Sequence, residues 1–525
     1  MREIFVADCE TDPFKKGRIP APFIWGLYNG KEFLHFNSTE TFLKYISEKE
    51  AIVYAHNGGK FDWHFLLDYL TPFSEIMVIS GRIARFKIGA CEFRDSYNII
   101  PVPLSAYQKT EIEYWKLEAQ FRAEYWDEIL SYLKDDCVFL FDLVDAFIKE
   151  YGVNITLAST ALKQLCKIEH IRPPKTTQDF YNQIKPFYHG GRVECFHKGE
   201  YKGEFTVVDV NSAYPKAMTE FHPYGAEYSF SQELPLFGVE QCFISLSARS
   251  TGAFPYRTIE GLSFPNDGKI RDFHITGWEY IAARDLGILH DETIKNVIEF
   301  DEKITFKKYV KHFFDMKAKA ELEKNAPRRL FAKLMLNSAY GKYAADPAEY
   351  EEYMIIDPKF IDAADTGGWN FAGLLGKWAV ISRPLAEDKQ HYYNVAVAAS
   401  ITGNQRARLL RGIYAVEKPL YGDTDSIAAV SMGSLIIGKE LGEWSVEAKC
   451  DYAAIAGKKL YAFHLLPEFI KNKKDYKIAC KGVRLTPAEI IRVAQGERIK
   501  YENEAPTFSY KKQPVFLKRN IVLTN

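Results

Sequence analysis

Carboxylates placed at the ends of apolar, strand-like runs are the feature that most constrains this chain. The apolar run 4–7 leads into Asp8 and Glu10, and the same two-residue spacing returns at Asp423 and Asp425 in a tight hairpin. Residues two apart in a strand face the same side. Two carboxylates facing each other repel unless a cation lies between them. We therefore predict sheets whose strand ends hold metal ions.

Length and composition restrict the class of protein. At roughly 150 residues per domain, 525 residues allow about three or four domains. Hydrophobic residues make up 47% and charged residues 26%, which is typical of globular proteins and excludes a mainly disordered chain. The net charge of -1 argues against a surface that coats a polyanion as a whole, so any nucleic-acid site must be local. No apolar run is long enough for a membrane span, and we expect a cytosolic protein.

The N-terminal part predicts one cluster of acidic groups. A second apolar strand, 51–55, leads through a Gly-Gly turn to Asp62, at the expected start of a helix around 65–67. A helical periodicity over 128–149 sets Tyr132 and Asp136 four residues apart on one face. That spacing lets a phenol and a carboxylate point into one cleft. For the pair Asp8 and Glu10 taken alone, a plain polar strand end is the competing interpretation.

A second cluster is expected from the later part of the chain. The strand-like run 205–210 contains Asp209, and the hairpin at 421–427 contains Asp423 and Asp425. If Asp209 and Asp425 meet, they form a two-metal site suited to phosphoryl transfer, where the charge of a triphosphate must be neutralised.

A basic helix lies between these two aspartates. Arg329, Lys333, Asn337 and Tyr340 fall at i, i+4, i+8 and i+11, on one face of a helix that we expect Gly341 to close. Two cations, an amide and a phenol in a row suit a bound triphosphate and its base.

The first cluster resembles the active site of the proofreading 3'-5' exonucleases of the DEDD type with tyrosine. Asp-x-Glu, Asn-x4-Asp and Tyr-x3-Asp occur in that family's order within 150 residues. The resemblance implies an RNase H-like domain with two Mg²⁺ ions and a tyrosine that orients the attacking water. The implied metal ligands are Asp8, Glu10, Asp62 and Asp136, with Tyr132 as the tyrosine. The implied contacts to the single-stranded DNA end are Thr11, Asn57, Phe61, Ser96, Tyr97 and Lys109.

The second cluster resembles the polymerase centre of family B DNA polymerases. Segments 209–215, 333–342 and 421–426 resemble motifs A, B and C, in the variants of the protein-primed branch of bacteriophages, and the N-terminal segments look closest to tectivirus polymerases. The resemblance implies that Mg²⁺, or Mn²⁺ in its place, is held as two ions per active site by Asp209, Asp425 and the Val210 carbonyl, with Asp423 beside them.

The same resemblance implies contacts to nucleotide and DNA. Arg329 and Lys333 would grip the triphosphate, Asn337 and Tyr340 would line the nascent pair, and Tyr214 would exclude a 2'-hydroxyl by steric clash. Either Lys317 or Lys319 adds a triphosphate contact, and the spacing does not choose between them. The implied DNA contacts are Tyr188, Gly190 and Gly191 of a Tyr-x-Gly-Gly segment, and Lys459 and Tyr461 of a Lys-x-Tyr segment.

The expected fold is therefore a multidomain α/β and α+β protein: an RNase H-like exonuclease domain followed by a right-hand polymerase with two insertions. We expect the exonuclease at 1–155, a linker at 156–187, palm at 188–222 and 381–484, a terminal-protein-contacting insertion at 223–308, fingers at 309–346, a strand-displacement and processivity insertion at 347–380, and thumb at 485–525.

The function expected from these motifs is replication of a linear, viral DNA from a protein primer, with proofreading and strand displacement. The expected partners are template and primer DNA, dNTPs and a terminal protein, for a monomer in the host cytoplasm. One alternative is a DNA-primed or self-priming family B repair polymerase, which would need no protein bearing a priming hydroxyl. The other is a non-catalytic nucleic-acid scaffold. The presence of an acidic residue at every expected ligand position argues against it.

Overall fold

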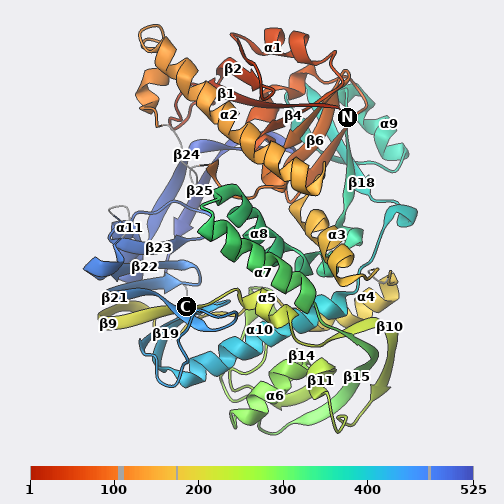
Figure 1. Cartoon of the computed structure of the whole chain (residues 1–525), viewed down its shortest axis with the longest axis vertical. Helices are drawn as coiled ribbons and strands as arrows, with labels where there is room; N and C mark the ends of the chain where they lie inside the picture. The colour runs from red at the N-terminus through yellow and green to blue at the C-terminus, as the bar shows by residue number, and fades with distance from the viewer. Residues whose placement is uncertain (1, 105–110, 173–174, 471–473, 524–525) are drawn as a thin grey trace.

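The computed structural model describes residues 2–104, 111–172, 175–470 and 474–523. The ten-stranded sheet lies at the top of the elongated molecule, the seven-stranded sheet lies at the left below the middle, and a third sheet lies at the bottom (Figure 1). Within the described residues, no helix is both long and apolar enough to cross a membrane.

The N-terminal sheet has ten strands in the order β17-β18-β16-β5-β6-β7-β4-β1-β2-β3. Its centre is parallel, because β1 pairs with β4 and β4 with β7 in the same direction. The strands are β1 (Glu3–Thr11), β2 (Pro22–Tyr28), β3 (Phe33–Phe36), β4 (Ala51–Ala55), β5 (Ser74–Ile79), β6 (Arg82–Ile88), β7 (Cys91–Asp95), β16 (Glu351–Ile356), β17 (Asn370–Leu375) and β18 (Trp378–Pro384).

Helices cover this sheet and place the acidic residues. Helix α1 (Thr39–Ile46) packs on β2 and β3, and α2 (Trp126–Tyr151) lies across β1 and β2, which confirms the helix predicted over 128–149. The helix expected around 65–67 is instead a series of short 3-10 helices, η1 (Gly58–Lys60), η2 (Asp62–Phe65) and η3 (Leu67–Tyr69). Close packing explains the tight turns, because a Cβ on Gly59 would lie 2.0 Å from the Ile83 carbonyl oxygen of β6.

The second large sheet has seven strands in the order β23-β22-β21-β9-β20-β19-β8. They are β8 (Val193–Cys195), β9 (Gly199–Val210), β19 (Glu417–Asp423), β20 (Ser426–Ser431), β21 (Trp444–Gly457), β22 (Leu460–Leu465) and β23 (Tyr476–Cys480). Helices α5 (Ala213–Met218) and α10 (Val395–Ala415) pack together beside it, and most of α10 is buried.

A third sheet, in the order β10-β15-β11-β14, follows α5 in the chain. Its strands are β10 (His222–Ser231), β11 (Phe243–Arg249), β14 (Ile270–Thr276) and β15 (Thr293–Ile304), joined by the small hairpin β12 (Tyr256–Thr258) and β13 (Gly261–Ser263) and by helix α6 (Gly277–Asp285). It occupies the part of the chain where the first insertion is expected.

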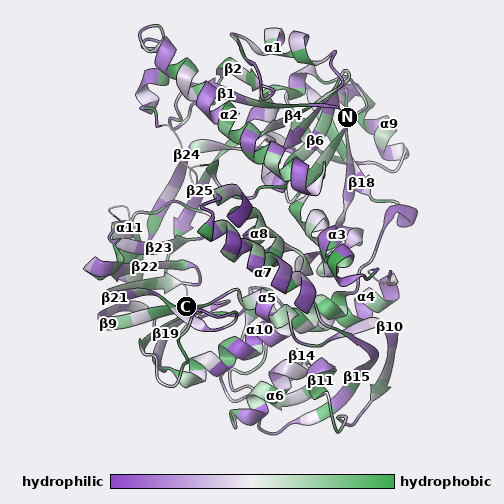
Figure 2. Ribbon diagram, viewed as in Figure 1, coloured by the Kyte–Doolittle hydropathy of each residue, from purple (hydrophilic) through white to green (hydrophobic). Residues whose placement is uncertain are grey.

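The middle layer is helical. Helices α3 (Leu157–Glu169), α7 (Lys307–Leu322) and α8 (Ala326–Ser338) share one hydrophobic core with α2 and α10. The outer sides of α7 and α8 are largely hydrophilic (Figure 2). Helix α4 (Gln178–Ile184) lies near the start of the third sheet (Figure 1). The prediction that Gly341 closes the basic helix is wrong, because α8 ends at Ser338 and the chain tightens into the 3-10 helix η9 (Tyr340–Ala344).

Strands β16 to β18 join the N-terminal sheet through pairing of β16 with β5. Helix α9 (Ile361–Thr366) connects β16 to β17. The C-terminal part consists of α11 (Pro487–Ala494) and the long hairpin β24 (Ile499–Ser509) and β25 (Lys512–Ile521). The tip of this hairpin touches β17, where a Cβ on Gly373 would lie 1.6 Å from the Lys511 carbonyl oxygen.

Candidate active sites

The strand pairing of the seven-stranded sheet brings Asp209 and Asp425 together. Ser426 at the start of β20 is the register partner of Asp209 in β9, and the Val210 N–H donates to the Asp425 carbonyl at 2.8 Å. Thr424 at the hairpin tip has φ 59°, a left-handed conformation that makes the turn tight. Two segments more than 200 residues apart thus place their carboxylates at one sheet end.

These two carboxylates are electrostatically strained. Burial, followed by repulsion from Asp425, raises the pKa of Asp209 to about 7. Burial, followed by repulsion from Asp423, raises the pKa of Asp425 to about 6. In addition, Oδ1 of Asp209 is buried with no hydrogen-bond partner among the described residues. Buried, mutually repelling carboxylate oxygens with an unused acceptor fit hard divalent cations.

Asp423 is held differently from the other two. Its Oδ1 accepts a hydrogen bond from the Thr424 hydroxyl at 2.9 Å and forms an ion pair with the Lys459 ammonium at 3.1 Å. The Lys459 backbone N–H donates to the Tyr421 hydroxyl at 2.7 Å, and the Tyr461 ring lies 5.0 Å from the Tyr421 ring. The Lys-x-Tyr segment is therefore attached directly to the hairpin that carries Asp423 and Asp425.

Glu447 is an acidic neighbour that the sequence analysis missed. It lies at a bulge in β21 and contributes to the raised pKa of both Asp209 and Asp425. Lys477 of β23 forms an ion pair with it. A bulge leaves no clear signal in a single sequence, since it depends on how the strand pairs with its neighbour.

The Tyr-x-Gly-Gly segment packs against the same hairpin. The Thr424 N–H donates to the Arg192 carbonyl at 2.7 Å, and a Cβ on Gly191 would lie 2.8 Å from the Thr424 hydroxyl oxygen. A larger residue at 191 would therefore press on the Thr424 side chain at the tip of the hairpin. On the other side, the Gln405 side-chain amide of α10 donates to the Thr424 carbonyl at 3.1 Å.

A buried ion pair holds the backbone of this segment. Arg406 of α10 donates to the carbonyls of His189 and Gly190, and its Nε lies 2.7 Å from Oε1 of Glu279 in α6. Both charged side chains are 2% exposed. Glu279 also accepts from the backbone N–H of Thr276 at 3.0 Å, closing a capping box at the start of α6. No motif in the sequence analysis pointed to either charged residue.

The basic side chains of α8 lie on the exposed side of the helical layer. Arg329, Lys333 and Asn337 are all exposed, and the Asn337 amide donates to the Lys333 carbonyl at 2.9 Å. Lys333 lies close enough to Asp209 for its positive charge to offset part of the rise that burial and Asp425 cause in the pKa of Asp209. The helix therefore faces the carboxylates of the seven-stranded sheet.

The structure separates the two lysines between which the sequence could not choose. Burial, followed by the positive charges of Arg329 and Lys333, lowers the pKa of Lys317, so this amine belongs to the same group of cations. Lys319 is exposed and lies 3.8 Å from the Glu323 carboxylate.

Tyr214 and Tyr340 form a stacked pair of rings. Their centroids are 4.6 Å apart at an interplanar angle of 20°. Tyr214 lies in the first turn of α5, which follows β9 and Asp209, and Tyr340 starts η9 just after α8. The stack therefore joins the segment after β9 to the end of the basic helix.

A second acidic group lies in the ten-stranded sheet. Ligand atoms of Asp8, Glu10 and Asp136 all fall within 4.8 Å of one another, a spacing that suits a shared metal ion. Burial, followed by the charges of Asp136, Glu10 and Asp8, raises the pKa of Tyr132, which is 4% exposed. The neutral phenol thus remains beside the carboxylates throughout the physiological pH range.

Asp62, the first residue of η2, contacts β1 through Cys9, the residue between Asp8 and Glu10. The Cys9 thiol donates to Oδ1 of Asp62 at 3.2 Å, and burial raises the pKa of Asp62 to about 6. Within the described part of the chain, the three-carboxylate group does not include Asp62. The Asp62 carboxylate is therefore hydrogen-bonded to the thiol of Cys9, the residue between Asp8 and Glu10.

The residues expected to contact a single-stranded DNA end differ in their exposure and in their contacts. Phe61 is half-buried, with its ring 5.4 Å from that of Phe508 in the C-terminal hairpin. The Asn57 side chain accepts from Arg82 at 2.9 Å, and the half-buried Tyr97 ring lies under the Arg82 guanidinium at 4.2 Å. Thr11 is 7% exposed.

Ser96 cannot contact DNA without leaving the core. It is fully buried and its hydroxyl donates to the Ala55 carbonyl at 3.1 Å. Lys109 lies outside the described residues.

Comparisons with known proteins agree with this architecture. A family model described as DNA polymerase type B, organellar and viral, matches residues 103–368. The DNA-directed DNA polymerase of Enterobacteria phage PRD1 is 37% identical, with 99% of this chain and 98% of the relative covered. The DNA polymerase of Bacillus phage phi29 is 22% identical over 98% of this chain and 96% of the relative.

Solved structures give the same fold. The phi29 DNA polymerase complexed with primer-template DNA and incoming nucleotide matches with a TM-score of 0.73 at 19% identity, covering 100% of both chains. The same enzyme complexed with single-stranded DNA matches with a TM-score of 0.74, also over 100% of both chains. The expected multidomain α/β and α+β fold is confirmed.

Proposed function

We propose a specific role for this chain, which belongs to the type B DNA polymerases of the viral and organellar class and is a DNA-directed DNA polymerase. In this role, it copies a linear viral genome from a protein primer and proofreads its product. Polymerases of this family depend on divalent metal ions, and the DNA strands and dNTPs are the substrates. The single observation that carries the polymerase assignment is the pairing of Asp209 with the Asp425 hairpin.

In this proposal, Asp209, Asp425 and the Val210 carbonyl hold two Mg²⁺ ions. Such ions, when bound, neutralise the triphosphate and favour the ionised form of the attacking 3'-hydroxyl. The orphaned Oδ1 of Asp209 and the raised pKa values of both carboxylates support this donor set. Asp423, already paired with Lys459, keeps the hairpin and the primer-side segment together.

The nucleotide is bound from the other side by α8. Arg329, Lys333 and Lys317 form a group of cations suited to the phosphates of an incoming dNTP. The Tyr214 ring, fixed by its stack on Tyr340, occupies the position under the sugar and rejects a 2'-hydroxyl by its bulk. Asn337 lines the nascent pair next to Tyr340.

The DNA strands are held at the two ends of the catalytic hairpin. Lys459 and Tyr461 steady the primer terminus, whereas Tyr188, Gly190 and Gly191 face the template strand. The contacts of both segments with the hairpin at Asp423, Thr424 and Tyr421 support this division, because movement of either strand would be transmitted to the catalytic carboxylates.

Proofreading is assigned to the N-terminal carboxylates. Asp8, Glu10 and Asp136, joined by Asp62 when metal is bound, would hold two Mg²⁺ ions, and the neutral Tyr132 phenol would orient a water molecule for attack. Phe61 offers a ring on which the terminal base stacks, while Thr11, Asn57 and Tyr97 line the path of the strand.

Domain roles follow from the same assignment. The sheet of β10, β11, β14 and β15 would contact the terminal protein. Strands β16 to β18 would separate the downstream strands and raise processivity. Their attachment to the exonuclease sheet on one side and to the thumb hairpin on the other supports a closed path around DNA. We propose a monomer that acts in the host cytoplasm.

The decisive experiment is covalent nucleotidylation of the protein primer. The chain is incubated with labelled dATP, Mg²⁺ and a purified candidate terminal protein, and the transfer of label to that protein is measured. Label resistant to denaturation is expected with the wild type and absent with Asp425→Ala. Efficient extension of an ordinary DNA primer, together with no transfer to any terminal protein of the same genome, would instead favour the DNA-primed repair polymerase.

A further inference from the structure

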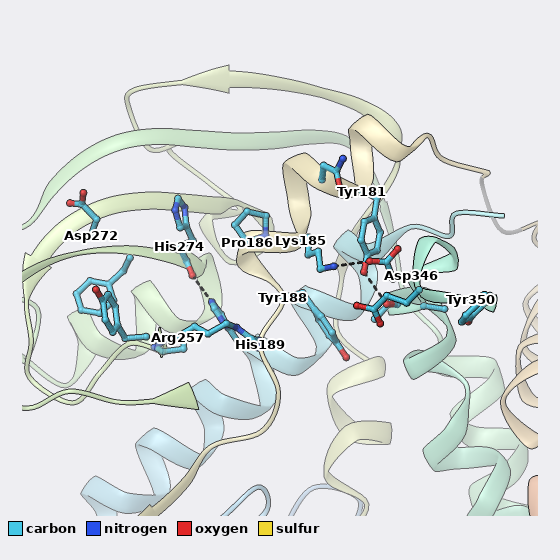
Figure 3. Close-up of a pocket in the computed structure, with 17 residues that line it drawn as sticks. Tyr181, Lys185, Pro186, Tyr188, His189, Arg257, Asp272, His274, Asp346 and Tyr350 are labelled. Atoms are coloured by element: carbon cyan, nitrogen blue, oxygen red, sulfur yellow. Dashed lines mark hydrogen bonds and ion pairs between the residues drawn. The ribbon is translucent and has the colours of Figure 1, made fainter. Parts of the chain in front are cut away.

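A cavity of 840 Å³ is lined by Tyr188 and His189, the first two residues of the Tyr-x-Gly-Gly segment. Its walls come from four parts of the chain: the linker with α4, residues 188–189, strands β12 and β14 of the first insertion, and residues 344–350 after η9 (Figure 3). The volume is within the roughly 300–1,000 Å³ of pockets that enclose small ligands. A single nucleoside therefore fits with space to spare.

Several tyrosine rings line the cavity. Tyr181, Tyr188 and Tyr350 stand on one side, as Figure 3 shows, and Tyr256 of β12 also lines the cavity. Nucleobases stack on such rings with little dependence on sequence. Tyr350 is 41% exposed, so its ring is not needed to fill the core.

The charges of the cavity select against a phosphate ligand. Two basic side chains, Lys185 and Arg257, face three acidic ones, Asp272, Asp346 and Glu349, which gives 2 − 3 = −1. Lys185 is moreover paired with Asp346 at 2.7 Å. Arg257, at the rim, makes no ion pair within the described part of the chain. An uncharged ring with hydrogen-bonding edges suits this lining better than a nucleotide triphosphate does.

His189 contributes an unused acceptor. Burial, followed by the charge of Arg406, lowers the pKa of His189 to about 4, so the ring is neutral. Its Nε2 donates to the His274 carbonyl at 3.2 Å, which leaves Nδ1 as an acceptor. Nδ1 is buried and has no partner among the described residues. Amino and imino groups of nucleobases are donors that would match it.

The cavity is next to the site of the nascent pair. Tyr188 lines it and also lies close enough to Tyr214 and Tyr340 to raise the pKa of both. The segment that continues from Tyr188 carries Gly191 and Arg192 to the Thr424 turn. A template strand bound along this segment would therefore run beside the cavity, because Tyr188 and His189 belong to both.

We infer that this cavity receives one unpaired base of the template strand, the base that waits next to the pair being formed. The base stacks between the tyrosines, and its phosphate stays outside, near Arg257. Holding the waiting base there keeps it out of the nascent-pair site until the strand advances. This inference rests on the template-side role proposed for Tyr188 and Gly191.

The test is abasic scanning of the template. Primer–template duplexes carry one abasic residue at each successive unpaired template position, and the primer ends in a phosphorothioate linkage that resists the exonuclease. Affinity is measured for the wild type, for Tyr256→Ala and Tyr350→Ala, and for Tyr350→Phe, which keeps the ring. Tyr45→Ala, which removes an exposed ring of α1, is the matched control.

In the wild type, an abasic residue at one unpaired position is expected to weaken binding about tenfold, the effect of losing one base stack, and its neighbours are expected to have little effect. Tyr256→Ala and Tyr350→Ala should bind the intact template more weakly and lose this penalty, whereas Tyr350→Phe and Tyr45→Ala should keep it. No position-specific penalty in the wild type, or an unchanged penalty in both alanine variants, overturns the inference. Primer extension on an intact template reports separately on the polymerase itself, so its failure would point to the polymerase site instead.

Discussion

The ion pair between Arg406 and Glu279 allows the sharpest test of how α6 is coupled to the Tyr-x-Gly-Gly segment and, through it, to the hairpin that carries Asp423 and Asp425. Both side chains are 2% exposed, and Nε and Nη2 of Arg406 lie 2.7 and 3.1 Å from the two oxygens of Glu279. In Arg406→Met, a buried carboxylate would be left without its cation, which costs about 3–5 kcal/mol. The His189 and Gly190 carbonyls would also lose their donor.

The measurement is hydrogen exchange of α6 and α10, read by mass spectrometry in Arg406→Met, Glu279→Leu and the double variant. Because only the single variants leave an unpaired buried charge, the loss of local stability in the double variant should be smaller than the sum of the two single losses by roughly 2–3 kcal/mol. Polymerase activity should fall in all three, and exonuclease activity on single-stranded DNA should not. Stability losses that add to within about 0.5 kcal/mol would refute the coupling.

Four further predictions concern the two carboxylate centres. Asp425→Ala should abolish nucleotide incorporation and leave exonuclease activity, and Asp8→Ala should do the reverse; loss of both activities in either variant, measured on the same primer–template, contradicts the two-site assignment. Tyr214→Val should raise ribonucleotide incorporation about tenfold or more, in line with loss of a steric rejection worth about 1–3 kcal/mol, and an unchanged ratio in single-nucleotide insertion assays would remove its gate role. The pKa values of Asp209 and Asp425 are raised to about 7 and about 6, so between roughly pH 4 and 7 the folded metal-free protein binds more protons than the unfolded chain. These two groups therefore lower the stability of the folded protein as pH rises through that window. Mg²⁺ should raise the melting temperature of the metal-free protein more at pH 8 than at pH 5.5, and an equal rise at both pH values would argue against metal at these residues. Cys9→Ala should weaken Mn²⁺ binding at the exonuclease site, measured calorimetrically in the Asp425→Ala background, with Cys9→Ser close to wild type; equal affinity in all three would show that the thiol does not position Asp62.

Local periodicity predicted which acidic residues share a face, and the resemblance to known motifs predicted that the separate segments gather. Asp8 and Glu10 share a strand face, Tyr132 and Asp136 share a helix face, and both pairs meet where α2 crosses β1. The meeting of Asp209 with the 421–427 hairpin was expected only from the resemblance to polymerase motifs, and the pairing of β9 with β20 brings it about.

Other features depend on tertiary contacts that one sequence does not encode visibly. Glu447 reaches the polymerase centre through a strand bulge. Arg406 and Glu279 are 127 residues apart and become partners only when α6 packs on α10. The hydrogen bond between Cys9 and Asp62 depends on the tight 3-10 turns around Gly59, which position Asp62. Strand β16 joins the exonuclease sheet because β5 offers an open edge, which no pattern within 347–380 reveals.

The most direct measurement of the central claim is anomalous diffraction from crystals soaked in Mn²⁺. Bound metal is expected in two separate places, one at Asp209 and Asp425 and one at Asp8, Glu10 and Asp136. Metal at one place alone, or at neither, would contradict a chain that builds and trims DNA at two distinct centres.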